Sequence, residues 1–286
     1  MKIGFIGTGI MGSPIVRHLS SKGYNVMVYN RTISKAEKLN DVAKVATSIA
    51  ELSKNSDVIF MIVGYPIDVE NVAYEIFKYA KKGTIIVDMT TSSPSLAGHL
   101  YEVAQQKGLY MLDAPVTGGE FGAINGTLSI MVGGDKDKFE SVIHLFETFG
   151  QTIKYMGKAG NGQRTKMANQ IAIAGALAGV VESLYYAQTL GLDLVKAHEI
   201  FVGGSASSNQ MKVNGMHIIN KNYEPGFYIK HFLKDLNLAI ESSPKHLEVT
   251  TKVRNMLNVL VDNDLENKGT QALMLYYLDN LVESDL

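Results

Sequence analysis

Lys166 is the residue of this chain whose type and place most suggest chemistry. It ends the segment Gly160-Asn161-Gly162-Gln163-Arg164-Thr165-Lys166, and the next fifteen residues, Met167 to Val181, carry no charge. Such a stretch predicts a buried helix. A lysine at its rim is partly desolvated, which lowers its pKa and suits it to proton transfer. Together with two glycine-rich segments, this lysine indicates a dehydrogenase whose proton shuttle is a lysine.

The first glycine-rich segment has the spacing of a dinucleotide-binding loop. Gly7-Thr8-Gly9-Ile10-Met11-Gly12 follows a short apolar run and opens a helical pattern. The first glycine allows a tight turn, the second lets the backbone approach a pyrophosphate, and the third lets helix and strand pack closely. A helix that begins here offers N–H groups and positive dipole to phosphates. The alternative is a glycine-rich turn without a ligand.

The end of the next apolar run bears on which dinucleotide is bound. Tyr29 is followed by Asn30, Arg31 and Thr32, where NAD-binding chains usually carry an acid. Arginine can grip a phosphate with two hydrogen bonds, so these three residues favour NADP, with NAD as the alternative. Arg31 could also be an ordinary cation on a solvated loop.

The second glycine-rich segment lies in the middle of the chain. Asp113-Ala114-Pro115-Val116-Thr117-Gly118-Gly119 follows another strand-like run. A hydroxyl beside two glycines presents backbone N–H groups to an anion, which suits a substrate carboxylate. The pattern is equally consistent with a turn.

The elements that must position these residues divide the chain near residue 160. Before it, short apolar runs alternate with helical patterns such as Val69–Ala80 and Ser95–Lys107. This alternation predicts an α/β fold, a doubly wound parallel sheet of the Rossmann type. The predicted strands are Lys2–Gly7, Tyr24–Asn30, Val58–Val63, Thr84–Met89, Tyr110–Asp113 and Ser129–Val132.

After residue 160 only helical patterns follow. One long helix is expected from Met167 to Leu190, with Gly191 as its stop. Further helices are expected at Val195–Phe201, Tyr228–Ser242, Leu247–Asn263 and Gly269–Glu283. The sequence therefore predicts an NADP-binding domain at 1–160 and an all-α C-terminal domain at 161–286, joined by the long helix.

Composition narrows the class of protein. The 286 residues are 46% hydrophobic and 19% charged with a net charge of −1, so we expect no nucleic-acid or membrane partner. Cysteine is absent, which excludes disulfides and thiolate chemistry, and no histidine pair has metal-ligand spacing, so no metal is predicted. The N-terminus lacks the pattern of a signal peptide, and a cytoplasmic location is expected.

These motifs, in this order and spacing, resemble those of the β-hydroxyacid dehydrogenase family, which includes 3-hydroxyisobutyrate dehydrogenase, tartronate semialdehyde reductase and the glyoxylate/succinic semialdehyde reductases. The resemblance covers essentially the whole chain. It rests on the loop at 7–12, the segment at 113–119, Gly160-x-Gly162-x-x-x-Lys166, and Phe227 with Lys234-Asp235-Leu236.

The resemblance implies a role for each matching position. Thr117, Gly118 and Gly119 would hold the substrate carboxylate, and Lys166 would be the catalytic acid/base. Asn169, Gln170 and Asp235 would face the substrate, and Phe227 would help to close the pocket. Val63, Gly64, Thr91 and Lys234 would contact the cofactor. Thr117 stands where the family most often has serine, and Gln170 where many members have asparagine, so the substrate stays open.

The leading hypothesis is therefore an NAD(P)-dependent oxidoreductase that interconverts a small 3-hydroxy acid and its semialdehyde. The resemblance also implies a homodimer or homotetramer. The alternative is a non-catalytic NADP-binding sensor or scaffold, which would need the loop at 7–12 but not Lys166. An imine reductase is a third reading, and it should lack a lysine at position 166.

Overall fold

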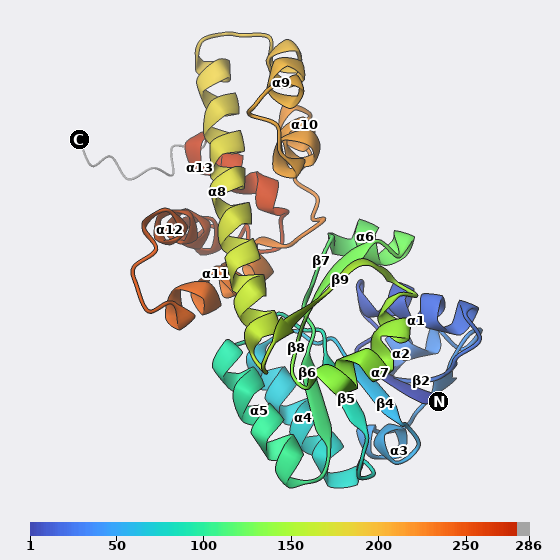
Figure 1. Cartoon of the computed structure of the whole chain (residues 1–286). Helices are drawn as coiled ribbons and strands as arrows, with labels where there is room; N and C mark the ends of the chain where they lie inside the picture. Colours follow the sequence, from blue (N-terminus) through green and yellow to red (C-terminus); the bar gives the residue numbers. More distant parts are fainter. Residues whose placement is uncertain (279–286) are drawn as a thin grey trace. The chain divides into compact units, whose positions relative to one another are not determined.

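The computed structural model describes residues 1–278. It divides into two compact units, Met1–Lys166 and the part from Met167 onward (Figure 1). The division falls inside helix α8 (Asn161–Thr189), so the first six residues of that helix belong to the first unit. The predicted boundary at residue 160 instead stands just before the helix.

The first unit is built on a nine-stranded sheet with the order β3-β2-β1-β4-β5-β6-β8-β7, and β9 also pairs with β8. Strands β1 to β6 are parallel wherever they pair, whereas β8 runs antiparallel to β6 and β7. The strands are β1 Lys2–Ile6, β2 Asn25–Tyr29, β3 Lys44–Val45, β4 Val58–Met61, β5 Ile85–Asp88, β6 Tyr110–Asp113, β7 Val116–Thr117, β8 Leu128–Gly133 and β9 Gly150–Gly157.

Helices cover both faces of this sheet, as expected of a doubly wound fold. Alternate residues of β4 point to opposite faces, so Phe60 packs in one apolar cluster and Ile59 and Met61 in another. The two clusters bury the apolar sides of the helices that cross between strands. These helices are α1 Gly12–Ser21, α2 Ile33–Glu37, α3 Ile49–Lys54, α4 Pro66–Tyr79, α5 Pro94–Gln106, α6 Gly119–Asn125 and α7 Lys136–Phe146.

Two features of the sheet differ from the sequence prediction. The sheet is not wholly parallel, because β8 returns antiparallel beside β6. Strands β3, β7 and β9 were not predicted. β3 and β7 have only two residues each, too few to form a recognisable apolar run. In β9 the exposed polar residues Gln151, Thr152 and Lys154 interrupt the run.

Helices and helical turns are the regular elements of the second unit within the described residues, apart from one isolated bridge between Tyr228 and Gly269. Its core gathers buried side chains from α8, α11 and α12, including Leu177, Phe232 and Leu257. The elements are α8, α9 Leu194–Gly203, the π-helical turn η1 Met211–Gly215, α10 Met216–Ile219, α11 Ile229–Ser242, α12 Glu248–Asp262, the 3-10 turn η2 Thr270–Met274 and α13 Leu275–Leu278.

The helix predictions for this unit are confirmed with two corrections. The long helix begins at Asn161 rather than Met167, which puts Lys166 in its second turn; Gly191, with φ of 69°, follows its end. The predicted helix Gly269–Glu283 is a 3-10 turn followed by α13 as far as Leu278, and positions 279–283 lie outside the described residues. By length and composition α8 could cross a membrane, but buried helices of soluble proteins meet the same criteria.

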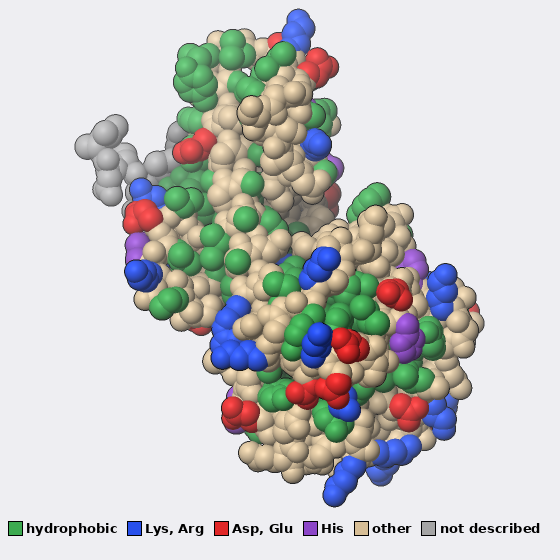
Figure 2. All heavy atoms as spheres, in the orientation of Figure 1, with side chains coloured by type: hydrophobic (Ala, Val, Ile, Leu, Met, Phe, Trp, Pro, Cys, Tyr) green, Lys and Arg blue, Asp and Glu red, His purple; other side chains and the backbone are tan. Residues whose placement is uncertain are grey.

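Acidic and basic side chains both lie at the surface, as in the exposed pairs Arg17–Asp41 and Lys78–Glu75. On the face drawn in Figure 2, acidic and basic side chains are interspersed. This agrees with the net charge of −1.

Candidate active site

The loop between β1 and α1 contains three glycines with three different surroundings. Gly7 has a φ of 96°, and a Cβ there would overlap the carbonyl oxygen of Ile62. A Cβ on Gly12 would overlap the carbonyl oxygen of Gly7, whereas a Cβ on Gly9 would meet nothing within 4 Å. Gly7 and Gly12 are therefore required by the loop itself, and Gly9 leaves its backbone open to a ligand. These are the three roles of glycine in a dinucleotide loop.

The start of α1 also fits an anionic ligand. The helix has no side-chain cap hydrogen bond and no acidic residue in its first turn. The Thr8 hydroxyl is buried without a hydrogen-bond partner, although the Thr8 N–H donates to Asn30 Oδ1 at 3.1 Å. Uncapped N–H groups at a helix start attract phosphate. The residues at 7–12, including half-buried Met11 and exposed Ile10, therefore fit the pyrophosphate of a dinucleotide.

The three residues after β2 differ in what they contact. Asn30 is engaged within the protein, because its Nδ2 donates to the Thr32 carbonyl oxygen at 2.9 Å while its Oδ1 accepts from Thr8. The Arg31 side chain is 89% exposed and forms an ion pair with Asp68 at 3.3 Å. Asp68 lies in the first turn of α4, and its other oxygen accepts from the Tyr65 N–H. Sequence reasoning missed this acid, which is distant from Arg31 in the chain.

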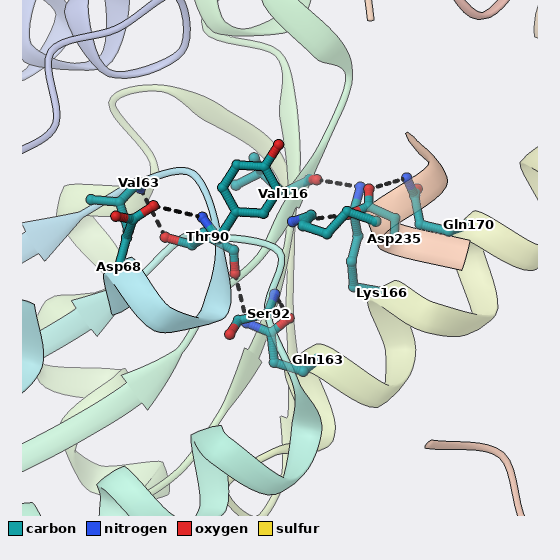
Figure 3. Close-up of polar contacts among 11 residues, drawn as sticks. Val63, Asp68, Thr90, Ser92, Val116, Gln163, Lys166, Gln170 and Asp235 are labelled. Atoms are coloured by element: carbon teal, nitrogen blue, oxygen red, sulfur yellow. Dashed lines mark hydrogen bonds and ion pairs between the residues drawn. The ribbon is translucent and has the colours of Figure 1, made fainter. Parts of the chain in front are cut away.

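Loops from neighbouring strands meet at the same edge of the sheet as the glycine loop. β1, β4 and β5 are adjacent and parallel, so the loops after them share the carboxyl edge, where ligands bind in this kind of fold. The Val63 N–H donates to Thr90 Oγ1 at 2.9 Å and ties two of these loops together (Figure 3). Gly64 and Thr91, both half-buried, follow in the same two loops. The structure thus brings the predicted cofactor-binding residues of the first unit to one edge.

The predicted carboxylate loop follows the short strand β7. Thr117 is half-buried, and Gly118 and Gly119 are exposed with φ values of 127° and 62°. L side chains rarely adopt either conformation, so both positions favour glycine. Gly119 also starts α6, and a Cβ on it would meet nothing within 4 Å. At Gly119 the backbone is therefore open to a small ligand, whereas a Cβ on Gly118 would lie 3.2 Å from Leu128 Cδ2.

Lys166 contacts the strand that carries this loop. Its side chain is buried, with 6% exposed, and its Nζ donates to the carbonyl oxygen of Val116 at 2.8 Å (Figure 3). Val116 immediately precedes Thr117. The ammonium is thereby held beside the segment predicted to bind the substrate carboxylate.

Two buried residues that sequence reasoning missed anchor the first turn of α8. The Asp113 carboxylate accepts from the N–H groups of Gly160 and Gln163, both at 2.8 Å. The Gln163 side chain accepts from the Ser92 N–H at 2.9 Å and donates to the Thr90 carbonyl oxygen at 2.7 Å. Burial raises the pKa of Asp113 to about 6, and the N–H donors offset part of that rise.

The second unit holds a chain of polar contacts that includes the other predicted residues. Asn169 Nδ2 donates to Gln170 Oε1 at 2.9 Å, and Gln170 Nε2 donates to Asp235 Oδ2 at 2.7 Å. The other Asp235 oxygen lies 3.0 Å from the Lys234 ammonium. Because the carboxylate only accepts, it fixes which way the Gln170 amide points, and Gln170 in turn orients Asn169.

The remaining predicted residue, Phe227, precedes Lys234 by seven positions in the sequence. It is 37% exposed and packs with its ring centroid 5.8 Å from that of Phe232.

His231 is half-buried on α11. Burial, followed by the charges of Lys234 and Lys230, lowers its pKa. Within residues 1–278, no group of three His, Asp or Glu side chains could hold a metal ion.

Comparison with known proteins identifies the family of this chain. Residues 2–157 match the model for the NAD-binding domain of 6-phosphogluconate dehydrogenase, and residues 160–277 match the NAD-binding domain of NADP-dependent 3-hydroxyisobutyrate dehydrogenase. A 2-hydroxy-3-oxopropionate reductase of Escherichia coli is 41% identical over 282 residues, covering 96% of each chain. The chain belongs to the β-hydroxyacid dehydrogenase family.

One further relative and one solved structure are also similar to this chain. A probable 3-hydroxyisobutyrate dehydrogenase-like protein of Arabidopsis thaliana is 42% identical over 285 residues, covering 96% of this chain and 84% of the relative. The solved structure of Psf3 in complex with NADP+ and 2-OPP is 27% identical, with a TM-score of 0.89 over 96% of this chain and 99% of that chain. The chain is therefore an oxidoreductase of the 3-hydroxyacid dehydrogenase family with a nicotinamide cofactor, and a non-catalytic sensor or scaffold is not favoured.

Proposed function

We propose that this enzyme interconverts a small 3-hydroxy acid and its semialdehyde with NADP, and that Lys166 transfers the proton. The observation that carries this proposal is the 2.8 Å hydrogen bond from Lys166 Nζ to the Val116 carbonyl oxygen. It holds a buried cation beside Thr117, Gly118 and Gly119. A substrate whose carboxylate is bound by that loop would have its aldehyde or hydroxyl carbon within reach of the same cation.

Each residue has a distinct task in this mechanism. The bound nicotinamide supplies the hydride for reduction and accepts it in oxidation. Lys166, as an ammonium, protonates the aldehyde oxygen as negative charge develops there; in oxidation, the neutral amine accepts the hydroxyl proton. The Thr117 hydroxyl and the N–H groups of Gly118 and Gly119 bind the carboxylate. The hydrogen bond to Val116 orients the ammonium, which reduces the entropy lost on reaching the reactive geometry.

We infer a preference for NADP from Arg31. Its guanidinium is 89% exposed, and its ion pair with Asp68 spans 3.3 Å. A solvent-exposed pair of this kind is weak. Arg31 can therefore exchange the carboxylate for a 2′-phosphate, which it binds with two hydrogen bonds.

The substrate class is that of the named relatives. The Escherichia coli relative is named for reduction of 2-hydroxy-3-oxopropionate, and the Arabidopsis relative for 3-hydroxyisobutyrate. Both names describe short acids, of three and four carbons respectively, that carry a carboxylate, as the loop at Thr117 requires. Gln170, which is longer than asparagine by one methylene, is expected to shift the preferred substrate length.

We also propose a cytoplasmic homodimer or homotetramer. Large apolar side chains are exposed at one end of the second unit, with Tyr186 at 66%, Leu190 at 58% and Ile200 at 74%. A subunit interface would remove them from water. Light scattering coupled to size-exclusion chromatography measures the mass, and a monomer at micromolar concentration would contradict this proposal.

Initial rates with NADPH and with NADH test the function. The aldehydes are glyoxylate and the semialdehydes of succinate, tartronate and methylmalonate. Lys166→Ala should abolish turnover while NADPH affinity stays nearly unchanged, because the phosphates bind at residues 7–12. Lys158→Ala, the same change at an exposed lysine, is the matched control. Normal turnover by Lys166→Ala would refute the assigned role, and tight NADPH binding without turnover of any aldehyde would favour the sensor or scaffold.

A further inference from the structure

The Gln163 side chain is completely buried in the first unit, and both ends of its amide are used. Its Oε1 accepts from the Ser92 N–H at 2.9 Å, and its Nε2 donates to the Thr90 carbonyl oxygen at 2.7 Å. Its backbone N–H donates to the Asp113 carboxylate at 2.8 Å. Thr90 and Ser92 are themselves buried, so no water replaces these contacts readily.

These bonds connect the first turn of α8 to the loops at the cofactor edge. Thr90 and Ser92 flank Thr91, a predicted cofactor contact. Thr90 also accepts from the Val63 N–H and donates its own N–H to Asp88 Oδ1, both at 2.9 Å. One amide therefore joins α8 to a segment that is already braced against the loop after β4 (Figure 3).

Lys166 follows Gln163 by three positions on the same helix, so the two side chains lie on one side of it. Gln163 is thus one anchor of Lys166. The other is the Val116 carbonyl oxygen, which accepts from Lys166 Nζ. The position of the Lys166 ammonium thus depends on two fixed points, one in the loop after β5 and one in the strand before the carboxylate loop.

We propose that Gln163 is a positioning residue that holds Lys166 in register with the loops that bind the cofactor. This inference rests on the proposed role of Lys166 as proton donor. Misplacing a catalytic group by about 1 Å can slow a reaction by roughly a hundredfold. A residue that merely stabilised the fold would instead lower the melting temperature and leave the turnover of the folded enzyme unchanged.

Gln163→Glu tests the proposal through pH. An ionised glutamate has no proton for the Thr90 carbonyl oxygen, but a protonated one has the same shape and hydrogen-bonding pattern as glutamine. We expect kcat to fall by about tenfold or more at pH 8. The ratio of variant to wild-type kcat should rise toward one as the pH falls toward 5.5. Asp88 and Asp113 at the strand ends, and Arg164 and Lys166 on α8, also lie near this side chain, and both enzymes carry them.

Gln163→Met removes both side-chain hydrogen bonds at nearly constant size. Its kcat should be low at every pH, while the dissociation constant for NADPH stays within about threefold because the phosphates bind at the glycine loop. Gln271→Met is the matched control: Gln271 is also buried, and its Nε2 donates to the carbonyl oxygens of Asn222 and Glu224 in the second unit. It should lose thermal stability but keep its kcat.

The outcomes separate the two proposals. If Lys166→Ala loses turnover but Gln163→Met keeps the wild-type kcat, only the positioning role is wrong. If Lys166→Ala keeps turnover, the proton-donor role fails and the positioning role fails with it. A low kcat of Gln163→Met and a ratio for Gln163→Glu that recovers in acid support both.

Discussion

Replacing Asp113 with asparagine should change how the stability of the first unit depends on pH. Two effects compete at this carboxyl: burial favours the neutral form, and N–H donors from Gly160 and Gln163 favour the charged form. Burial prevails and raises its pKa to about 6 from 3.8. A carboxyl whose pKa is higher in the folded chain contributes stability that is full below pH 3.8 and is lost as the pH rises through 6.

The size of the effect follows from these two values. The whole loss amounts to roughly 3 kcal/mol, of which roughly 2 kcal/mol falls between pH 4.5 and 7.5. Asp113→Asn removes the ionisation. It also costs about 1–3 kcal/mol at every pH, because the amide nitrogen cannot accept an N–H bond. The wild type should therefore melt at a higher temperature than Asp113→Asn at pH 4.5. This difference in melting temperature should shrink by about 4–8 °C between pH 4.5 and 7.5.

Scanning calorimetry at pH 4.5, 6 and 7.5 measures this gap. Asp137→Asn is the control: Lys138 lowers the pKa of this exposed carboxyl, so it stays ionised over this whole pH range and the gap for this variant should be nearly constant. A gap for Asp113→Asn that is constant, or that widens with pH, would show that the helix N–H groups outweigh burial and refute the reasoning.

Further predictions concern cofactor preference, the glycine loop and the second unit. Arg31→Ala should raise the KM for NADPH about tenfold, because a charge-assisted phosphate contact is lost, and should have little effect on the KM for NADH. Asp68→Asn should lower the KM for NADPH, because Arg31 loses a competing carboxylate. Steady-state kinetics with both cofactors test these two predictions, and an unchanged KM for NADPH would contradict the variant's prediction. Gly12→Ala should destabilise the enzyme by about 1–3 kcal/mol because its Cβ overlaps backbone. Gly9→Ala should keep its melting temperature and bind NADPH more weakly in fluorescence titration; the opposite pattern would contradict the assigned roles. Gln170→Leu should cost about 1–3 kcal/mol in calorimetry by leaving a buried carboxylate oxygen without its donor, and an unchanged transition would count against that contact.

The glycine loop could be predicted from sequence because its constraints are local. The overlap that excludes a side chain at Gly12 involves the carbonyl of Gly7, five residues earlier. The short apolar runs and the helical patterns likewise located the buried strands and the long helices. Lys166 was found for the same reason, since an isolated charge beside an apolar helix is visible in the sequence.

The anchors of α8 could not be predicted in this way. Gln163 bonds to residues 71 and 73 positions away, and Asp113 to residues 47 and 50 positions away, so these partners are known only once the order of the strands is known. For the same reason the amides of Asn30 and Gln170 were expected to face ligands, and their bonds to protein groups emerged only from the fold. Their contacts with cofactor and substrate stay predictions.

The bonds from α8 to Asp113 bear on how the chain can be shortened. The family model for the nucleotide domain ends at residue 157, before Gly160 and Gln163. A fragment cut there would leave a buried carboxylate, and the N–H of Ser92, without the groups that satisfy them. During synthesis, too, the first unit would stay incomplete until the opening turn of α8 had left the ribosome. An isolated cofactor-binding fragment should therefore extend at least through Lys166, where the first compact unit ends.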